Sequence, residues 1–337
     1  MNDMRKETSL ETDEAVEALL GKATPRPVPP EAEARAVREV VQAEWRQVSG
    51  KHRKKKTFLR MAMAASVLVA VFVALNTLRI TGIEEVQVAS IDKRFGMISI
   101  LGENSELLEG SHLTTIVAGQ TLITDDDSGM GLSWGAGGSL RIDQNTRVEF
   151  LSDEKVYLSS GRIYFDSAPA LAAHSVDGSD ARLIIVTDFG EVTHTGTQYM
   201  THADGEAVTV SVREGAVVIE YAGRSSSAVE GQQLAISGSG ARMANIPSHG
   251  TPWNWIEKTV PSVNLDGRSV SEFLRWVSRE TGLDLEYETD GAAAYADREL
   301  LKGSMNTDPR QALQVWMLGM DLGWRIEDGV IYVNDAR

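Results

Sequence analysis

The sequence predicts a single-pass membrane protein: a short helical cytoplasmic segment, one transmembrane helix, an all-β domain and a small α+β C-terminal domain. Three observations predict this class. An uncharged apolar run extends from Met61 to Leu78, positive charge gathers on its N-terminal side, and the hydrophobic periodicity changes from helical to alternating beyond it. Roughly 255 of the 337 residues follow the run, which is enough for two ordinary domains.

These patterns divide the chain into consecutive segments. We expect a cytoplasmic helical segment at 1–50, a basic juxtamembrane stretch at 51–57, a transmembrane helix at 58–78, a connecting region at 79–114, a β domain at 115–222, a linker at 223–259 and an α+β domain at 260–337.

The first 50 residues are expected to form two short helices separated by a proline-rich spacer. Thr12 is a suitable N-cap for the first helix and Gly21 ends it, whereas the second helix begins after Pro30. Apolar residues recur at helical spacing in both, and the candidate partner-binding residues are Leu19, Leu20, Val37, Val40, Val41 and Trp45.

Two narrow apolar stripes within 50 residues bury too little surface to form a stable core. Something else must therefore cover them. Two alternatives remain open: the stripes pack on each other or on the inner leaflet of the membrane, or they bind a partner that offers a groove to a helix.

The apolar run from Phe58 to Leu78 has the length of a membrane-spanning helix, because about 20 residues cross a hydrocarbon layer of about 30 Å. The basic stretch at 51–57 indicates a cytoplasmic N-terminus, which places residues 80 onward on the other side of the membrane. A secretory signal peptide and a buried core helix are the alternatives. The first would stand nearer the N-terminus, and the adjacent basic cluster disfavours the second.

Charge is distributed unevenly along the chain. Residues 1–79 carry a formal charge of +4 and residues 80–337 carry −19. The acidic outer part argues against direct binding of nucleic acid there. The chain contains no cysteine, which excludes disulfides and thiol catalysis.

The region after the apolar run alternates between apolar and polar residues in short segments that are rich in β-branched and aromatic side chains. We predict strands at Leu140 to Asp143, Arg147 to Leu151, Val156 to Leu158, Arg162 to Phe165, Arg182 to Thr187, Glu191 to Thr193, Ala207 to Val212 and Ala216 to Glu220. At Gly196 and Gly215 we expect a tight turn or bulge that needs a positive φ, rather than a ligand contact.

The last segment has the pattern strand, helix, strand, strand, helix and two strands. Ser269 and Glu272 have the spacing of a capping box, and Gly282 ends that helix. Asp308 caps the second helix, and the Asp328-Gly329 pair is expected to turn a closing hairpin.

No group of residues predicts an enzyme, a metal site or a cofactor. His194 and His202 lack the clustered carboxylate or third histidine of a metal site, and Asp125 to Asp127 lacks the alternating ligands of a calcium loop. Surface or turn positions are the expected role of these residues, and we expect neither catalysis nor a bound cofactor.

The β region resembles the FecR family of periplasmic sensor domains, over about residues 115–222. The matching stretches are Gly119 to Thr124, Gly138 to Val148, Val156 to Phe165, Thr187 to Val192, Thr195 to Tyr199 and Val208 to Val217. One departure is Gly135 to Gly138, where family members often have an acidic residue before the glycine.

Residues 260–337 resemble the short N-terminal (STN) domain shared by secretins and TonB-dependent receptors. The similarity lies in Ser269 to Leu274, Thr281 to Leu283, Gly303-Ser304 and Pro309 to Leu313. The N-terminal segment is similar to the anti-sigma segments of FecR proteins through Leu19-Leu20, the Pro-Arg-Pro spacer and Trp45.

These resemblances together imply a transmembrane regulator of an extracytoplasmic-function sigma factor, in the inner membrane of a bacterium, with its N-terminus in the cytoplasm and its C-terminal domains in the periplasm. The N-terminal helices would bind the sigma factor, and the periplasmic part would receive a signal from a TonB-dependent outer-membrane receptor, as in iron or nutrient uptake. The alternative is an envelope assembly or structural protein that binds a secretin-like or receptor partner and has no role in transcription.

Overall fold

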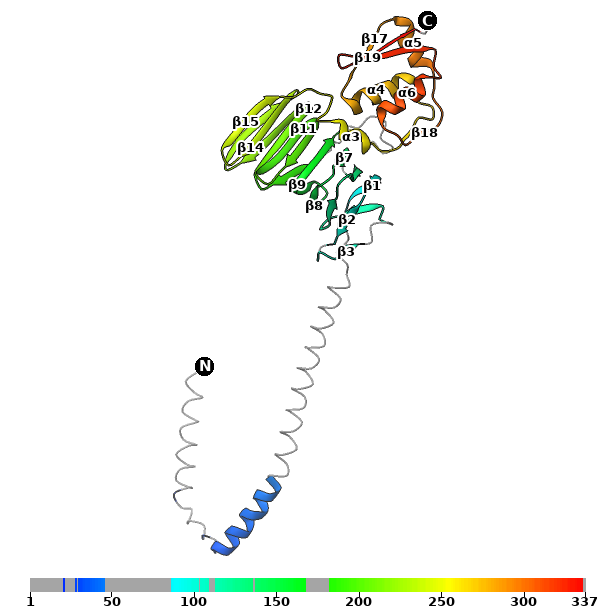
Figure 1. The fold of residues 1–337 in the computed structure, drawn as a ribbon. Helices are drawn as coiled ribbons and strands as arrows, with labels where there is room; N and C mark the ends of the chain where they lie inside the picture. The colour runs from blue at the N-terminus through cyan, green and yellow to red at the C-terminus, as the bar shows by residue number, and fades with distance from the viewer. Residues whose placement is uncertain are drawn as a thin grey trace, which may run out of the picture. The chain divides into compact units, whose positions relative to one another are not determined.

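The computed structural model describes residues 21, 28, 30–45, 86–102, 104–108, 113–135, 137–167 and 182–335 (Figure 1). The chain divides into two compact units, Met1–Ile83 and Glu84–Arg337. In the first unit a helix covers residues 31–45, as predicted. It begins after Pro30, whose carbonyl oxygen accepts hydrogen bonds from the N–H groups of Glu33 and Ala34 at 3.0 and 3.1 Å.

The predicted fold class needs a correction. No helix within the described residues is long and apolar enough to cross a membrane. The expected span, Phe58 to Leu78, lies outside the described residues, as does the basic stretch at 51–57. The single-pass class rested on the apolar run, the charge on its N-terminal side and the change of periodicity beyond it, whereas the described chain is mostly β with a small α+β part at its C-terminal end.

The β domain contains fifteen described strands in one branched sheet. They are β1 Gln87–Phe95, β2 Ile98–Leu101, β3 Leu107–Leu108, β4 Thr115–Val117, β5 Thr121–Thr124, β6 Gly129–Trp134, β7 Ser139–Ile142, β8 Arg147–Phe150, β9 Lys155–Asp166, β10 Ile184–Thr187, β11 Gly190–Ala203, β12 Ala207–Tyr221, β13 Arg224–Val229, β14 Gln232–Ser237 and β15 Gly240–Asn245. The main path runs β15-β14-β12-β11-β10-β9-β7-β6-β1-β4, and β2, β3, β5, β8 and β13 branch from it.

The strand β9 joins two segments that the sequence predicts as separate strands. Its first half pairs with β8, and its second half pairs with β7 and β11. The change of partner occurs at Gly161, which has a φ of +90°. Because glycine adopts this conformation without steric cost, the chain bends there and continues as a strand instead of turning back.

The strands β11 and β12 are also longer than predicted, and the two glycines inside them form bulges. Gly196 and Gly215 have φ values of +55° and +78°, and the pairing register shifts between Thr195 and Gln198. A Cβ atom on Gly215 would collide with the carbonyl oxygen of Gly196. The prediction of a bulge at these positions is confirmed.

The β domain extends beyond the predicted segment on both sides. Strands β1 to β3 lie within the expected connecting region 79–114, and β13 to β15 lie within the expected linker 223–259. Leu234 and Ile236 of β14 are buried in the core. The serine- and glycine-rich composition resembles a linker, but β12 pairs with both β13 and β14 and supplies the hydrogen-bond partners that a local pattern does not reveal.

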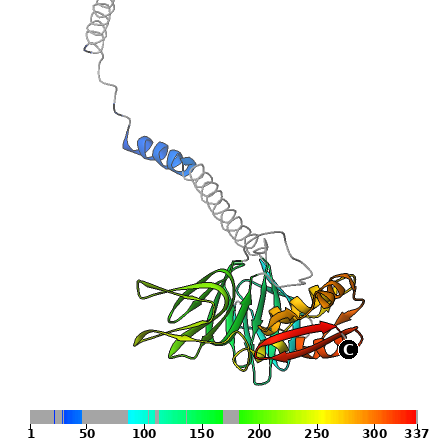
Figure 2. The same ribbon diagram turned by 90° about the horizontal axis from the view of Figure 1, so that it is seen from above.

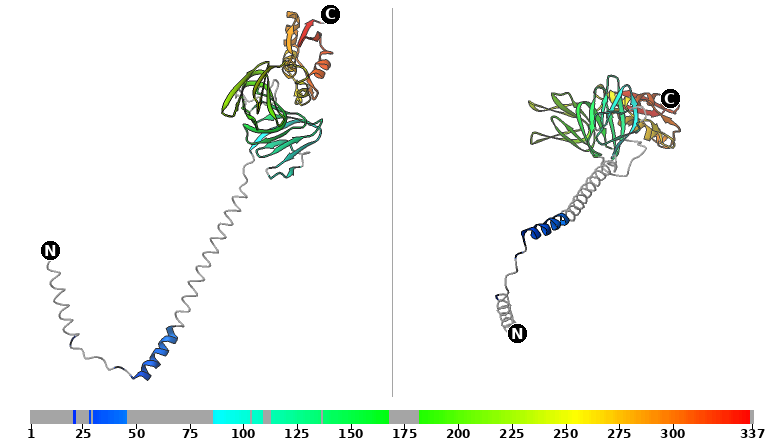
Figure 3. Two further views of the ribbon diagram at one scale, coloured as in Figure 1. Left: turned by 60° about the vertical axis from the view of Figure 1, so that its left-hand side comes forward. Right: turned by 90° about the horizontal axis from the view of Figure 1, so that it is seen from below.

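The α+β part follows the predicted pattern, with two additional helices. Its elements are α3 Asn254–Lys258, β16 Val263–Asn264, α4 Val270–Thr281, β17 Asp284–Tyr287, α5 Asp290–Arg298, β18 Ser304–Met305, α6 Pro309–Met317, β19 Leu322–Glu327 and β20 Val330–Asp335. Helices α4 to α6 pack around the sheet β17-β20-β19. In Figures 2 and 3 these orange and red elements lie beside the strands of the β domain.

The predicted caps of α4 and α6 are confirmed. Ser269 and Glu272 form a reciprocal capping box, and Gly282 ends α4 with a φ of +69°. Asp308 caps α6. The sequence does not predict α5, because Ala292 and Ala296 alone form its buried face and both are too small to mark a periodic apolar stripe.

Candidate functional site

The predicted partner-binding residues of the second helix lie on one exposed face. Val37 and Val40 are each 64% exposed, Val41 is 57% exposed and Trp45 is 73% exposed. At 100° per residue these four positions fall on one side of helix 31–45. Large apolar side chains on one helix face that remain more than half exposed are typical of a surface that another molecule covers.

The rim of this face is charged. Glu33, Ala34, Val37, Arg38 and Val41 line a shallow hollow on it. The hollow therefore offers an apolar floor with one acidic and one basic side chain beside it. Leu19 and Leu20, the other two candidate residues, lie outside the described residues.

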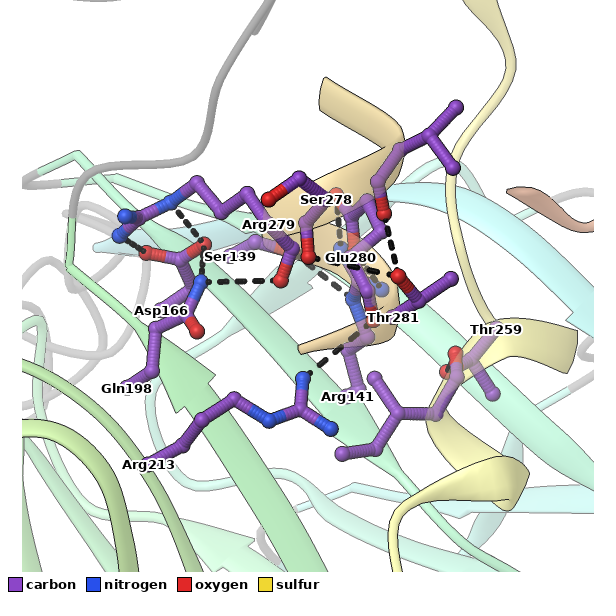
Figure 4. Close-up of polar contacts among 12 residues, drawn as sticks. Ser139, Arg141, Asp166, Gln198, Arg213, Thr259, Ser278, Arg279, Glu280 and Thr281 are labelled. Carbon is purple, nitrogen blue, oxygen red and sulfur yellow. Dashed lines mark hydrogen bonds and ion pairs between the residues drawn. The ribbon is translucent and has the colours of Figure 1, made fainter. Parts of the chain in front are cut away.

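A second group of interacting side chains joins the C-terminal end of α4 to the β domain (Figure 4). Arg141 of β7 donates to both carboxylate oxygens of Glu280, with Nη1–Oε2 at 2.7 Å and Nη2–Oε1 at 3.0 Å. Both side chains are almost completely buried, at 1% and 4% exposure. We call these two residues, together with Asp166, Gln198, Arg213, Glu214, Trp253 and Arg279, the junction cluster.

Arg279 forms the second ion pair of the junction cluster. It donates to both oxygens of Asp166, with Nε–Oδ2 at 3.0 Å and Nη2–Oδ1 at 2.6 Å. Its Nη1 also donates to Glu214 Oε2 at 2.7 Å. Gln198 donates to Asp166 Oδ2 at 2.9 Å, so Asp166 is held from both sides.

Arg213 of β12 completes the junction cluster. Its Nη1 donates to the carbonyl oxygen of Glu280 at 3.3 Å, and its guanidinium carbon lies 4.4 Å from the ring centroid of Trp253. Nε and Nη2 of Arg213 are buried and donate to no hydrogen-bond acceptor among the described residues. Arg213 is therefore a buried cation whose lost hydration is only partly replaced by hydrogen bonds.

The strands present these residues on the face opposite to the hydrophobic core. Along β7 and β9, Leu140 and Phe165 point into the core, while Arg141 and Tyr164 point the other way. Arg141 pairs with Tyr164 across the sheet, and Asp166 pairs with Gln198 two residues further along the same face, so the junction cluster spans two adjacent rows of residues on neighbouring strands. Alternation alone would leave these rows exposed to water.

The charges of the junction cluster shift the pKa values of its arginines. Burial disfavours the charged form of Arg141, but the carboxylate of Glu280 outweighs that effect and raises its pKa above the ordinary value. Burial similarly disfavours charged Arg279, and the hydrogen bonds to Asp166 raise its pKa overall. Burial lowers the pKa of Arg213, which lacks an equivalent carboxylate.

The residues of the junction cluster do not stand out in the sequence. Arg141, Asp166 and Arg213 occupy outward positions of strands, where charged residues are ordinarily solvated, and their partners come from α4 more than 60 positions further along the chain. Trp253 in the expected linker is the one local signal, since a tryptophan there needs a surface to cover it.

His194, His202 and the run Asp125 to Asp127 make ordinary structural contacts among the described residues. Among the described residues there is no group of three or more side chains that could hold a metal ion. His194 accepts a hydrogen bond from the N–H of Leu183 at 3.1 Å and packs with its ring centroid 5.1 Å from that of Phe165. Burial lowers the pKa of His202. Asp126 accepts a hydrogen bond from Asn145 at 2.8 Å within a surface turn.

Comparison with known proteins agrees with the β domain. Residues 120–218 match the family model described as FecR protein. The chain therefore contains a FecR family domain, and the predicted resemblance over 115–222 is confirmed at that level. The match does not extend to the C-terminal domain, so its STN-like character stays a prediction.

Two crystal structures from Parabacteroides distasonis ATCC 8503, both described as "a putative anti-sigma factor", are among the similar solved structures. Their sequence identities to this chain are 14% and 15%. In each case the match covers 64% of this chain and 99% of the other chain, with a TM-score of 0.34. No curated protein matches the chain.

Proposed function

We propose that this protein regulates an extracytoplasmic-function sigma factor, which it binds through the exposed apolar face of helix 31–45. The observation that carries the proposal is the exposure of Val37, Val40, Val41 and Trp45 on one helix face. The FecR family domain supports it, because the FecR resemblance implies an N-terminal segment that holds a sigma factor away from RNA polymerase.

Burial of the exposed face supplies the affinity in this proposal. Complete burial of one large apolar side chain contributes about 1.5–3 kcal/mol. A helix in a hydrophobic groove uses apolar side chains at i, i+3, i+4 and i+7. Val37, Val40 and Val41 stand at i, i+3 and i+4, and Trp45 follows on the same face at i+8. Glu33 and Arg38 at the rim would select the partner's register by charge.

The proposal assigns residues 1–50 to the cytoplasm and residues 80–337 to the periplasm, where a TonB-dependent receptor with a signalling domain would be the partner. The acidic charge of residues 80–337 and their lack of cysteine are compatible with this compartment. Reporter fusions after residues 50 and 335 measure the two locations. A cytoplasmic reporter signal from the second fusion would contradict the assignment.

Binding is tested with the full chain and the extracytoplasmic-function sigma factors of the source bacterium. In a pull-down followed by titration, Trp45→Ala and Val41→Asp should each weaken binding about tenfold or more, since 1.4 kcal/mol corresponds to tenfold. Glu39→Ala, on the opposite face of the same helix, should bind as the unchanged chain does. Equal binding by all three variants, or no binding by the unchanged chain, would contradict the proposed function.

A further inference from the structure

We propose that residues 260–335 dock reversibly on the outer face of the β domain, and that the junction cluster is the latch of this two-state junction. The ion pairs Arg141–Glu280 and Asp166–Arg279 hold the docked state (Figure 4), and the pairs Glu214–Arg279 and Glu257–Arg310 also cross the junction. The inference does not depend on sigma-factor binding.

Each side of the junction has a hydrophobic core of its own. Among the described residues, one core extends from Val88 to Ile236 within the β domain, and a second extends from Val260 to Val333. A third, small cluster joins Tyr164 and Met200 to Ile246, Trp253 and Ile256, and so ties α3 to the β domain. Separation after α3 therefore leaves both large cores intact.

The contacts that α4 makes across the junction are predominantly polar. Besides the three ion pairs of Arg279 and Glu280, Gln198 donates to the carbonyl oxygen of Arg279 and Arg213 donates to that of Glu280. Interfaces of this polarity between domains resemble transient protein interfaces. A buried ion pair also gains little net free energy, because the desolvation of both charges offsets most of their attraction. Ion pairs of this kind specify one docked orientation without making it strong.

Arg213 opposes docking. In the docked state its guanidinium is buried beside that of Arg141, and its Nε and Nη2 have no hydrogen-bond acceptor among the described residues. Release of α4 would admit water to these N–H groups and remove the cost of leaving them unpaired. The junction thus combines four ion pairs that favour docking with one buried cation that disfavours it.

Release would uncover two charged surfaces at once. Arg141, Asp166 and Arg213 would become accessible on the sheet, and Arg279 and Glu280 on the end of α4. A partner that bound either surface would shift the equilibrium toward the separated state by its difference in affinity for the two states.

The test measures the distance between the two sides in the full chain. The native sequence has no cysteine, so Ser225→Cys on β13 and Asp297→Cys on α5 provide two unique and exposed sites for spin labels. Pulsed electron resonance should show one dominant distance for the labelled chain. Glu280→Gln should raise the ratio of separated to docked molecules by at least about tenfold, because Arg141 is left buried without its carboxylate. Arg213→Met should lower that ratio.

The matched control is Glu288→Gln. Glu288 also receives two hydrogen bonds from one arginine, Arg325, at 2.7 and 2.8 Å, but both residues belong to the C-terminal domain. This variant should leave the distances unchanged. Arg279→Gln repeats the test if Glu280→Gln does not fold.

Three results would overturn the inference. The first is an unchanged distance distribution in the folded Glu280→Gln or Arg279→Gln chain. The second is a loss of structure in both domains with both variants, which would make the junction part of one cooperative core. The third is a larger separated population in Arg213→Met than in the unchanged chain.

Discussion

Arg141 illustrates how little the type of a residue says about its surroundings. A charged side chain at an outward position of a strand is ordinarily solvated, yet this one is completely buried. Its burial depends on Glu280, which is 139 positions away in the sequence. Glu257 shows the reverse balance: burial raises the pKa of its carboxyl despite the ion pair with Arg310 at 2.9 Å.

The glycines of the β11 and β12 bulges are constrained in a way that the sequence does predict. Gly215→Ala should destabilise the β domain by more than the about 1–2 kcal/mol that a positive φ costs an ordinary residue. The additional cost arises because the new Cβ would collide with the carbonyl oxygen of Gly196. Urea unfolding of the full chain measures the change in the free energy of unfolding.

Gly205→Ala is the control for this prediction. Gly205 also has a positive φ, +86°, but no described atom lies within 4 Å of the position its Cβ would occupy. Gly205→Ala should therefore lower the free energy of unfolding only by the conformational cost of the positive φ. Equal destabilisation by the two variants would show that crowding between the bulges contributes nothing.

At the scale of elements, the termini of helices are the features that local sequence determines best. In α4 the Ser269 hydroxyl accepts from the N–H of Glu272 at 3.1 Å, and the Glu272 carboxylate accepts from the N–H of Ser269 at 2.8 Å. This second hydrogen bond lowers the pKa of Glu272. All the participants lie within four consecutive residues, so the spacing suffices to predict the motif.

Ser269→Ala should destabilise the C-terminal domain by about 1 kcal/mol, since the N–H of Glu272 loses its acceptor at the start of α4. Thermal unfolding followed by circular dichroism checks this value. Ser269→Thr keeps a hydroxyl at the cap and should retain most of the stability. A loss as large in the threonine variant would attribute the effect to packing around residue 269 instead of the cap.

The strands β13 and β14 show where local patterns fail at the scale of elements. Their serine-rich sequence predicts a linker, but both pair with β12, and Ala228, Leu234 and Ile236 complete the core of the β domain. Strand formation depends on a partner strand, and no local periodicity identifies that partner.

At the scale of the whole molecule, the boundary of the β domain can be tested by truncation. A chain of residues 84–246 should unfold cooperatively, because it retains every member of the core from Val88 to Ile236. A chain of residues 84–222, which ends where the sequence predicts the boundary, should be unfolded or severely destabilised. Loss of one buried Leu or Ile costs about 2–5 kcal/mol, and a whole domain has about 5–15 kcal/mol.

Circular dichroism and urea titration of the two truncated chains measure this difference. Cooperative unfolding of residues 84–222 at the same urea concentration as residues 84–246 would restore the linker interpretation of 223–259.

The sequence by itself determined the helix caps at Ser269 and Asp308, the bulges at Gly196 and Gly215, and the β segments that resemble the FecR family. It also predicted the apolar stripe of helix 31–45. These features depend on residues a few positions apart, or on conformations that one residue type alone adopts easily.

Only the tertiary structure decided the extent of the β domain, the helix α5 and the junction cluster, and it corrected the single-pass fold class. The first three depend on which distant surface covers a given side chain. Burial turns Arg141 and Asp166 from solvated surface charges into paired ones and leaves Arg213 without a carboxylate partner, because removing water strengthens every charge interaction and penalises every charge left unpaired.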